Sequence, residues 1–192
     1  MTTSPAPRRL ALPLLPLVAA FAGCATTFLH GQAGGVVGTS GTVGGAIEGA
    51  YGRGFGGIGI EVSARAKFTP DVISGALGAG LFAAGGGRFG GPMIYGHLGA
   101  HALQLDVIDQ TPYVSAFSPY LTGGVGFCVD GCARPTDSNT LLGVTTSSHE
   151  QTFITVGLAA EYDVRFVRSG EGFFGLMVGY GFREQQETHL PF

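Results

Sequence analysis

Long stretches of this chain alternate strictly between apolar side chains and polar or small ones. In the run Ile58–Phe68, the apolar residues alternate with Gly59, Glu61, Ser63, Arg65 and Lys67. The same alternation recurs at Thr152–Phe166 and at Phe173–Arg183. Because successive side chains of a β-strand point to opposite faces, this period of two predicts strands with one apolar face and one polar face.

The length and chemistry of these runs favour a membrane barrel over a soluble sheet. They span about 10–14 residues, whereas strands of soluble proteins have about 5–6 and a tilted transmembrane strand needs about 9–11. The apolar faces end in aromatic residues, as membrane-interface girdles do, namely Tyr51, Phe68, Phe166, Phe174 and Phe182. We therefore expect an all-β fold, a closed antiparallel up-and-down transmembrane β-barrel whose closure leaves no unpaired edge in lipid.

The number of strands follows from closure, since most bacterial single-chain barrels have an even number. Weaker alternation adds four strands to the three clear ones, at Val43–Tyr51, Val72–Phe82, Met93–Leu105 and Pro119–Val129. An eighth strand is then required. We expect it at Asn139–Ser147, with Gln32–Thr39 as the second candidate, and eight strands would bring both chain ends to one side of the membrane.

The composition excludes several other classes of protein. Hydrophobic residues make up 45% of the chain and charged residues 12%, which excludes intrinsic disorder. The 35 glycines among 192 residues have no three-residue period, so the chain is not collagen-like. With 10 basic and 13 acidic residues there is no basic excess, and we expect no nucleic-acid partner.

The first residues have the parts of a secretory signal. Arg8 and Arg9 supply positive charge, and the apolar stretch Leu10–Ala22 is too short and too interrupted by proline to span a bilayer. Phe21–Cys24 resembles the lipobox of bacterial lipoprotein signals, in which the cysteine is lipidated and becomes the N-terminus; a cut after Ala22 is the alternative. We expect a signal peptide at 1–23, a tether at 24–42, the barrel at 43–183 and a tail at 184–192.

Over about Val43–Arg183, the pattern resembles the small eight-stranded outer-membrane barrels related to the OmpA transmembrane domain and the opacity-type proteins. The resemblance implies a bacterial outer-membrane location, contact with outer-membrane lipid, and a non-enzymatic structural or surface-recognition role. A lipobox before such a barrel is a departure, because those families usually carry plain signal peptides.

Charged residues occupy the inward face of the expected strands. They are four acids and four bases: Glu48, Glu61, Glu161, Asp163, Arg65, Lys67, Arg165 and Arg183. The interior of an eight-stranded barrel is filled by side chains, and a buried charge is costly unless it is paired. We therefore expect these charges to pair and plug the lumen. A narrow ion-selective pore is the alternative, although it would favour one sign of charge.

The remaining candidate sites are weaker. Export to an oxidising compartment favours a disulfide between Cys128 and Cys132, whereas zinc would need further ligands at suitable spacing. His97 and His101 lie about 13 Å apart along one strand, too far to share a metal. We expect no catalytic residue, cofactor or metal.

Two other functions stay open. One is a barrel enzyme that modifies outer-membrane lipids, and the other is a soluble, lipid-anchored periplasmic β protein. Residues 147–150 contain the residue types of a Ser-His-acid site, but their consecutive placement near an expected turn favours a solvated turn.

Overall fold

Antiparallel strands make up almost all of the described chain. The computed structural model describes residues 25–70, 72–87, 91–108, 111–115, 117–132, 137–141, 144–164 and 170–189. The strands are β1 (Ala25–Gly38), β2 (Val43–Phe55), β3 (Ile58–Phe68), β4 (Val72–Gly86), β5 (Met93–Ile108), β6 (Thr111–Ser115), β7 (Ser118–Asp130), β8 (Asp137–Leu141), β9 (Val144–Asp163) and β10 (Glu171–His189).

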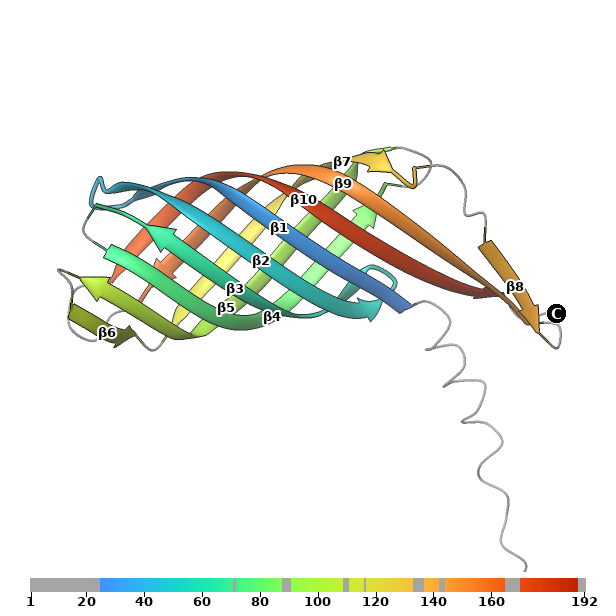
Figure 1. Ribbon diagram of the computed structural model, residues 1–192, viewed down its shortest axis with the longest axis horizontal. Helices are drawn as coiled ribbons and strands as arrows, with labels where there is room; N and C mark the ends of the chain where they lie inside the picture. Colours follow the sequence, from blue (N-terminus) through green and yellow to red (C-terminus); the bar gives the residue numbers. More distant parts are fainter. Residues whose placement is uncertain are drawn as a thin grey trace, which may run out of the picture.

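Eight of these strands form a closed barrel (Figure 1). Their order is β10-β1-β2-β3-β4-β5-β7-β9, and the pairing of β9 with β10 closes the ring. β6 pairs with the end of β5, and β8 pairs with the start of β9, both beyond the ring. The predicted fold class, a closed antiparallel β-barrel, is confirmed.

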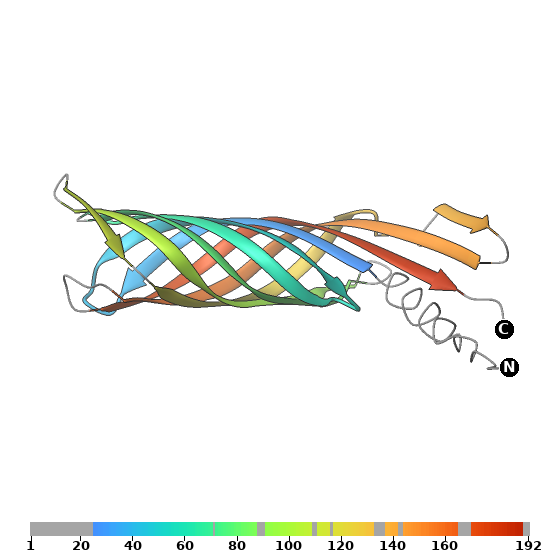
Figure 2. The ribbon, with the colours of Figure 1, turned by 90° about the horizontal axis from the view of Figure 1, so that it is seen from below.

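Both ends of the described chain lie at one end of the barrel, because Thr26 of β1 is paired with Gln185 of β10 (Figure 2). We call this end the near end and the opposite one, with the turn between β1 and β2, the far end. β6 projects at the far end and β8 at the near end (Figure 1).

The barrel buries its polar face and exposes its apolar face. On β3, Lys67 is 1% exposed whereas Ile60 is 71% exposed. On β9, Asp163 is 0% exposed whereas Leu158 is 68% exposed. Soluble proteins bury apolar side chains and leave charged ones in water, so this barrel is inverted relative to them. The inward and outward positions predicted for the three clear runs are confirmed wherever the structure describes the side chains.

Exposed aromatic side chains form two groups on the outer surface. Tyr51, Phe55, Phe127 and Tyr180 lie toward the near end, and Phe68, Phe117, Tyr162 and Phe174 lie toward the far end. Between them the outer surface carries exposed aliphatic residues such as Leu121, Leu158 and Leu176. Two aromatic bands around an apolar band are the pattern of a transmembrane barrel.

The eighth strand is not where we expected it. It is β1, at Ala25–Gly38, which overlaps the second candidate and not Asn139–Ser147. Residues 139–141 lie in β8 and residues 144–147 in the part of β9 beyond the ring. The expected tether at 24–42 and tail at 184–192 are also wrong, because β1 is a barrel strand and β10 continues to His189. Residues 1–24, with the signal peptide and Cys24, lie outside the described residues.

Glycines on the inner wall make room for aromatic rings in the lumen. A Cβ added to Gly99 would lie 2.6 Å from the Tyr120 hydroxyl oxygen and 2.5 Å from the Ala79 carbonyl oxygen. A Cβ on Gly80 would lie 2.9 Å from the same hydroxyl. The ring of Tyr120 can therefore lie against the wall only because these positions have no side chain.

Gly99→Val should destabilise the barrel by about 1–3 kcal/mol, because the new side chain displaces Tyr120 from a filled interior. The measurement is denaturant unfolding of the refolded protein in detergent micelles. Gly31→Val is the matched control, since nothing lies within 4 Å of a Cβ there, and we expect a change within about 0.5 kcal/mol. Equal destabilisation by both substitutions would contradict this account of the inner wall.

Candidate functional site

The candidate site is the lumen, which holds a buried cluster of four charged side chains toward the far end. This charge cluster consists of Arg65, Lys67, Glu161 and Asp163, whose side chains are 0–8% exposed. Arg65 pairs with Glu161, and Lys67 pairs with Asp163. The cross pairs, Arg65 with Asp163 and Lys67 with Glu161, are each at 3.7 Å. Each charge therefore faces opposite charge, as burial requires.

Two further buried acids lie beyond the charge cluster and are held by other partners. Tyr120 donates its hydroxyl to Glu61 Oε1 at 2.8 Å, and His97 Nδ1 contacts Glu61 Oε2. Gln32 Nε2 donates to Glu48 Oε2 at 3.1 Å. These hydrogen bonds lower the cost of burying the two carboxylates.

A chain of polar contacts joins the middle of the lumen to the charge cluster. Ser63 Oγ donates to the Tyr120 hydroxyl at 3.2 Å and lies 3.4 Å from His101 Nε2. His101 Nδ1 lies 3.3 Å from Glu161 Oε1. The order serine, histidine, acid is that of a catalytic triad. A hydrolase also needs an open approach to the nucleophile, whereas Ser63 is 5% exposed and His101 stacks on Tyr120. Ser63 and Tyr120 are therefore paired with each other as buried polar groups, whereas His101 Nδ1 and Glu161 Oε1 lie within ion-pair distance without forming a hydrogen bond.

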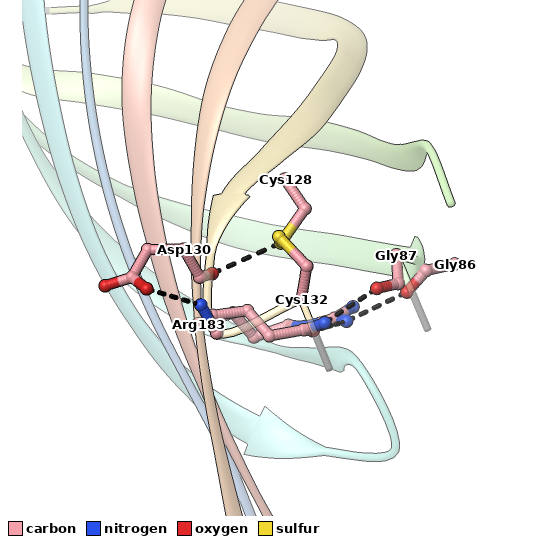
Figure 3. The surroundings of a disulfide bond; sticks show 8 residues. Gly86, Gly87, Cys128, Asp130, Cys132 and Arg183 are labelled. Atoms are coloured by element: carbon pink, nitrogen blue, oxygen red, sulfur yellow. Dashed lines mark hydrogen bonds between the residues drawn. A yellow bond between two sulfur atoms is a disulfide. The ribbon is translucent and has the colours of Figure 1, made fainter. Parts of the chain in front are cut away.

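The near end of the lumen is filled by an apolar cluster and bridged by side-chain hydrogen bonds. The cluster consists of Phe28, Phe82, Ala84, Met93, Tyr95 and Phe153. Arg183 donates to the Gly86 carbonyl at 2.8 Å and to Gln151 Oε1, and Gln151 donates to the Gly87 carbonyl at 2.6 Å (Figure 3). The end of β4 and the next residue, Gly87, are thereby held against the opposite wall.

A disulfide lies beside this near-end closure. It joins Cys128, at the end of β7, to Cys132, and their Cα atoms are 5.8 Å apart (Figure 3). Cys128 packs against the apolar cluster. Gly131, between the two cysteines, has φ +67°, a conformation that favours glycine. The disulfide thus holds a tight turn where the chain leaves β7.

The barrel has counterparts among solved structures. No family model and no curated protein matches the chain. Neisserial surface protein A (NspA) aligns over 83% of this chain and 95% of its own, at 10% identity and a TM-score of 0.49. Ail, the attachment invasion locus protein of Yersinia pestis, aligns over 84% of this chain and 98% of its own, at 13% identity and a TM-score of 0.36. These similarities concern the barrel and no particular residue.

The structure separates Arg183 from the other described residues expected to form one charge network. Arg183 lies in the near-end closure, on the opposite side of the middle hydrogen bonds from the charge cluster. Glu48 and Glu61 are hydrogen-bonded to Gln32, His97 and Tyr120. They stay next to the charge cluster, because Glu48 lies opposite Arg65 in the pairing of β2 with β3 and the contacts of Tyr120, Ser63 and His101 lead from Glu61 to Glu161. Arg165 lies outside the described residues. The expectation of one network is therefore corrected for Arg183, which is held in the near-end closure.

Several lumen residues were missed by the sequence analysis. His30 stacks on His97 with ring centroids 5.3 Å apart and lies 2.9 Å from Thr155 Oγ1. His30 and Gln32 belong to β1, so alternation in that strand could have found them. Residues 147–150, expected in a turn, are paired with β10 in a strand.

Neither a membrane-spanning helix nor a metal-binding group is found in the described part of the chain. No helix there is long and apolar enough to cross a bilayer. No group of three or more His, Cys, Asp or Glu side chains there could hold a metal ion.

Proposed function

We propose that this protein is a bacterial outer-membrane β-barrel with a plugged lumen and a structural or surface-recognition role. The observation that carries the proposal is the inversion of the two faces, with apolar residues outward and paired charges buried. An exposed apolar band between two aromatic bands favours lipid over water as the surrounding medium. In a soluble periplasmic protein, the whole apolar band would be exposed to water, and soluble proteins rarely expose so large an apolar surface.

The orientation of the barrel follows from its strand count. Outer-membrane barrels with an even number of strands have both ends of the chain on the periplasmic side, which assigns the near end to the periplasm. The far end, with the β5–β6 projection, then faces the outside of the cell. Recognition of a partner or ligand outside the cell would therefore use the far-end loops.

Fractionation and heat-modifiable gel migration test the membrane assignment. We expect the wild-type protein in the outer-membrane fraction, resistant to carbonate extraction, with a folded band that shifts when the sample is boiled. A protein that carbonate or high salt extracts from the membrane would contradict the proposal and favour the soluble alternative.

We expect the protein to conduct few ions, because side chains fill its lumen. The charge cluster and the near-end closure occupy the interior at two levels, so reconstituted wild-type protein in a planar bilayer should give no stable open level above the baseline of the lipid alone. Arg183→Ala should also stay closed, because the charge cluster remains. Steady conductance steps from the wild type would favour the narrow-pore alternative.

We further propose that Cys24 is lipidated. It directly precedes Ala25, the first residue of β1, so a lipid there would lie at the near-end membrane interface without a spacer. A palmitate analogue fed to cells should label the wild type and not Cys24→Ser. Equal labelling of both would exclude Cys24 as the acylated residue, and a mature N-terminus at Gly23 would favour the plain signal peptide.

A further inference from the structure

A row of polar side chains crosses the outer surface of the barrel at the near end. It consists of Arg53 on β2, Thr27 on β1, Glu184 on β10 and Glu150 on β9, and we call it the near-end row. The register places its members side by side, through the pairs Thr27↔Arg53, Thr27↔Glu184 and Glu184↔Glu150. Each member is next in sequence to a buried residue of the lumen, so all four side chains point outward.

The near-end row rises out of the expected lipid layer from Arg53 toward Glu150, because the strands are tilted. In the other direction from Arg53, the same register passes aliphatic residues that are 55–71% exposed on the outer surface, namely Ile60, Leu81, Leu98 and Leu121. Glu184 lies one pair before the end of the β1–β10 pairing, and Glu150 lies beyond the last pair of β7 with β9. Arg53 is therefore the deepest member in the membrane, and the two glutamates lie nearest the water.

Arg53 lies at the depth of lipid headgroups. It is two residues from Tyr51 on one side and from Phe55 on the other, and both belong to the near-end aromatic band, which marks the membrane interface. The side chain of Arg53 is exposed, and no described residue lies within ion-pair distance of it. Because a guanidinium group can bind a phosphate through two parallel N–H donors, this position suits the phosphate of a lipid.

The acidic end of the row suits a positive group. Glu184 and Glu150 lie directly opposite each other, and like charges in that position destabilise a sheet. Ser148 and Gln186 donate to Glu184 Oε1 at 3.3 and 2.9 Å, which positions this carboxylate and leaves its negative charge in place. Since an ionised carboxylate has about four acceptor sites, it can accept a further donor. An ammonium group beside the two glutamates would reduce their repulsion.

We propose that the near-end row binds one phospholipid whose headgroup carries a phosphate and a primary ammonium group, as ethanolamine phospholipids do. Arg53 and the Thr27 hydroxyl donate to the phosphate, and the two glutamates accept from the ammonium group. The order of charges fits, because the phosphate adjoins the glycerol in the membrane and the ammonium group is at the outer end of the headgroup. The assignment of this lipid to the periplasmic leaflet rests on the proposed function.

The spacing of the row also fits such a headgroup. The backbones of Arg53 and Glu184 are two strand spacings apart, about 10 Å. The long arginine side chain and the headgroup can together span this distance. Thr27 lies between the two charged residues, beside the expected position of the phosphate.

The test is native mass spectrometry of the refolded full chain, released from detergent micelles that contain equal amounts of three lipids. Phosphatidylethanolamine has both charged groups, phosphatidylcholine has no N–H on its nitrogen, and phosphatidylglycerol has no positive group. We expect one phosphatidylethanolamine to be retained in preference to the other two. Arg53→Gln should lower its retention about tenfold, as loss of a charged hydrogen-bonded contact does. Glu150→Gln/Glu184→Gln should remove the preference for phosphatidylethanolamine over phosphatidylglycerol.

Arg53→Gln/Val129→Arg is the matched control. Val129 is 52% exposed on the outer side of β7 at the near end, so this variant keeps the charge of the wild type but has its arginine outside the row. It should retain as little lipid as Arg53→Gln. Restored retention would show that any arginine at this end attracts lipid, and would overturn the proposal. Equal retention of the three lipids by the wild type, or unchanged retention by Arg53→Gln, would overturn it too.

Folding and membrane insertion are measured separately from lipid binding. Heat-modifiable migration of each variant reports whether the barrel has folded, and carbonate extraction of the wild type tests the membrane assignment. A folded, carbonate-resistant wild type that shows no lipid preference would therefore overturn the lipid site and leave the proposed function standing.

Discussion

Leu158→Arg should remove most of the protein from the outer-membrane fraction. Leu158 is 68% exposed on β9 and lies midway between Ile154 and Tyr162, which belong to the levels of the two aromatic bands. An arginine at the bilayer midplane of a barrel costs about 2–4 kcal/mol, a large share of the roughly 5–15 kcal/mol that stabilises a typical domain. The measurement is the fraction of protein in the heat-modifiable folded band of isolated outer membranes.

Val43→Arg is the matched control for this prediction. Val43 is also outward-facing, 62% exposed, but it is the first residue of β2 beside the far-end turn. The same charge near the interface costs about 0–1 kcal/mol, so this variant should assemble almost normally. Equal loss of both variants would contradict the assigned depth of Leu158. A Leu158→Arg protein that appears as a folded, membrane-free species would instead favour the soluble alternative.

Most of the barrel could be predicted because alternation along a strand is a local property. In β3 every second residue is charged or small, and the residues between them are all apolar, so the two faces can be assigned from the sequence. β1 was only the second candidate for the eighth strand, because its outward positions include Gly31, Ala33 and Gly35, which face the same way as Leu29 and Val37. Small residues on the lipid face weaken the contrast on which the pattern depends.

The contacts inside the lumen could be predicted only in part. Alternation shows which residues of a strand point inward, so the burial of Glu61, Arg65 and Lys67 followed from the sequence. The partners of these residues could not be predicted in the same way. Lys67 and Asp163 are 96 residues apart in the sequence and meet only through the closure and stagger of the barrel. The prediction that Arg183 joins the charge network was wrong for the same reason. The level of Arg183 along the barrel axis depends on the register of β10, which the sequence alone does not show.

Lys67→Met should destabilise the barrel by about 3–5 kcal/mol, because it leaves buried carboxylates without their cation. Lys67 is 1% exposed, pairs with Asp163 and lies 3.5 Å from the centre of the Phe173 ring. Methionine keeps most of the side-chain volume, so the loss reports charge rather than a cavity. Denaturant unfolding in detergent micelles measures the effect, with folding of each variant checked by heat-modifiable migration.

The double variant Lys67→Met/Asp163→Leu separates pairing from packing. Replacing a buried ion pair by apolar residues of similar volume is often neutral or stabilising, whereas breaking the pair on one side is costly. The double variant should therefore recover most of the stability that Lys67→Met loses. If Lys67→Met alone unfolds at the wild-type denaturant concentration, Asp163 does not need its partner and the charge cluster is not a paired plug. If the double variant is as unstable as Lys67→Met, Lys67 acts through contacts other than its pair with Asp163, with Phe173 as the first to examine.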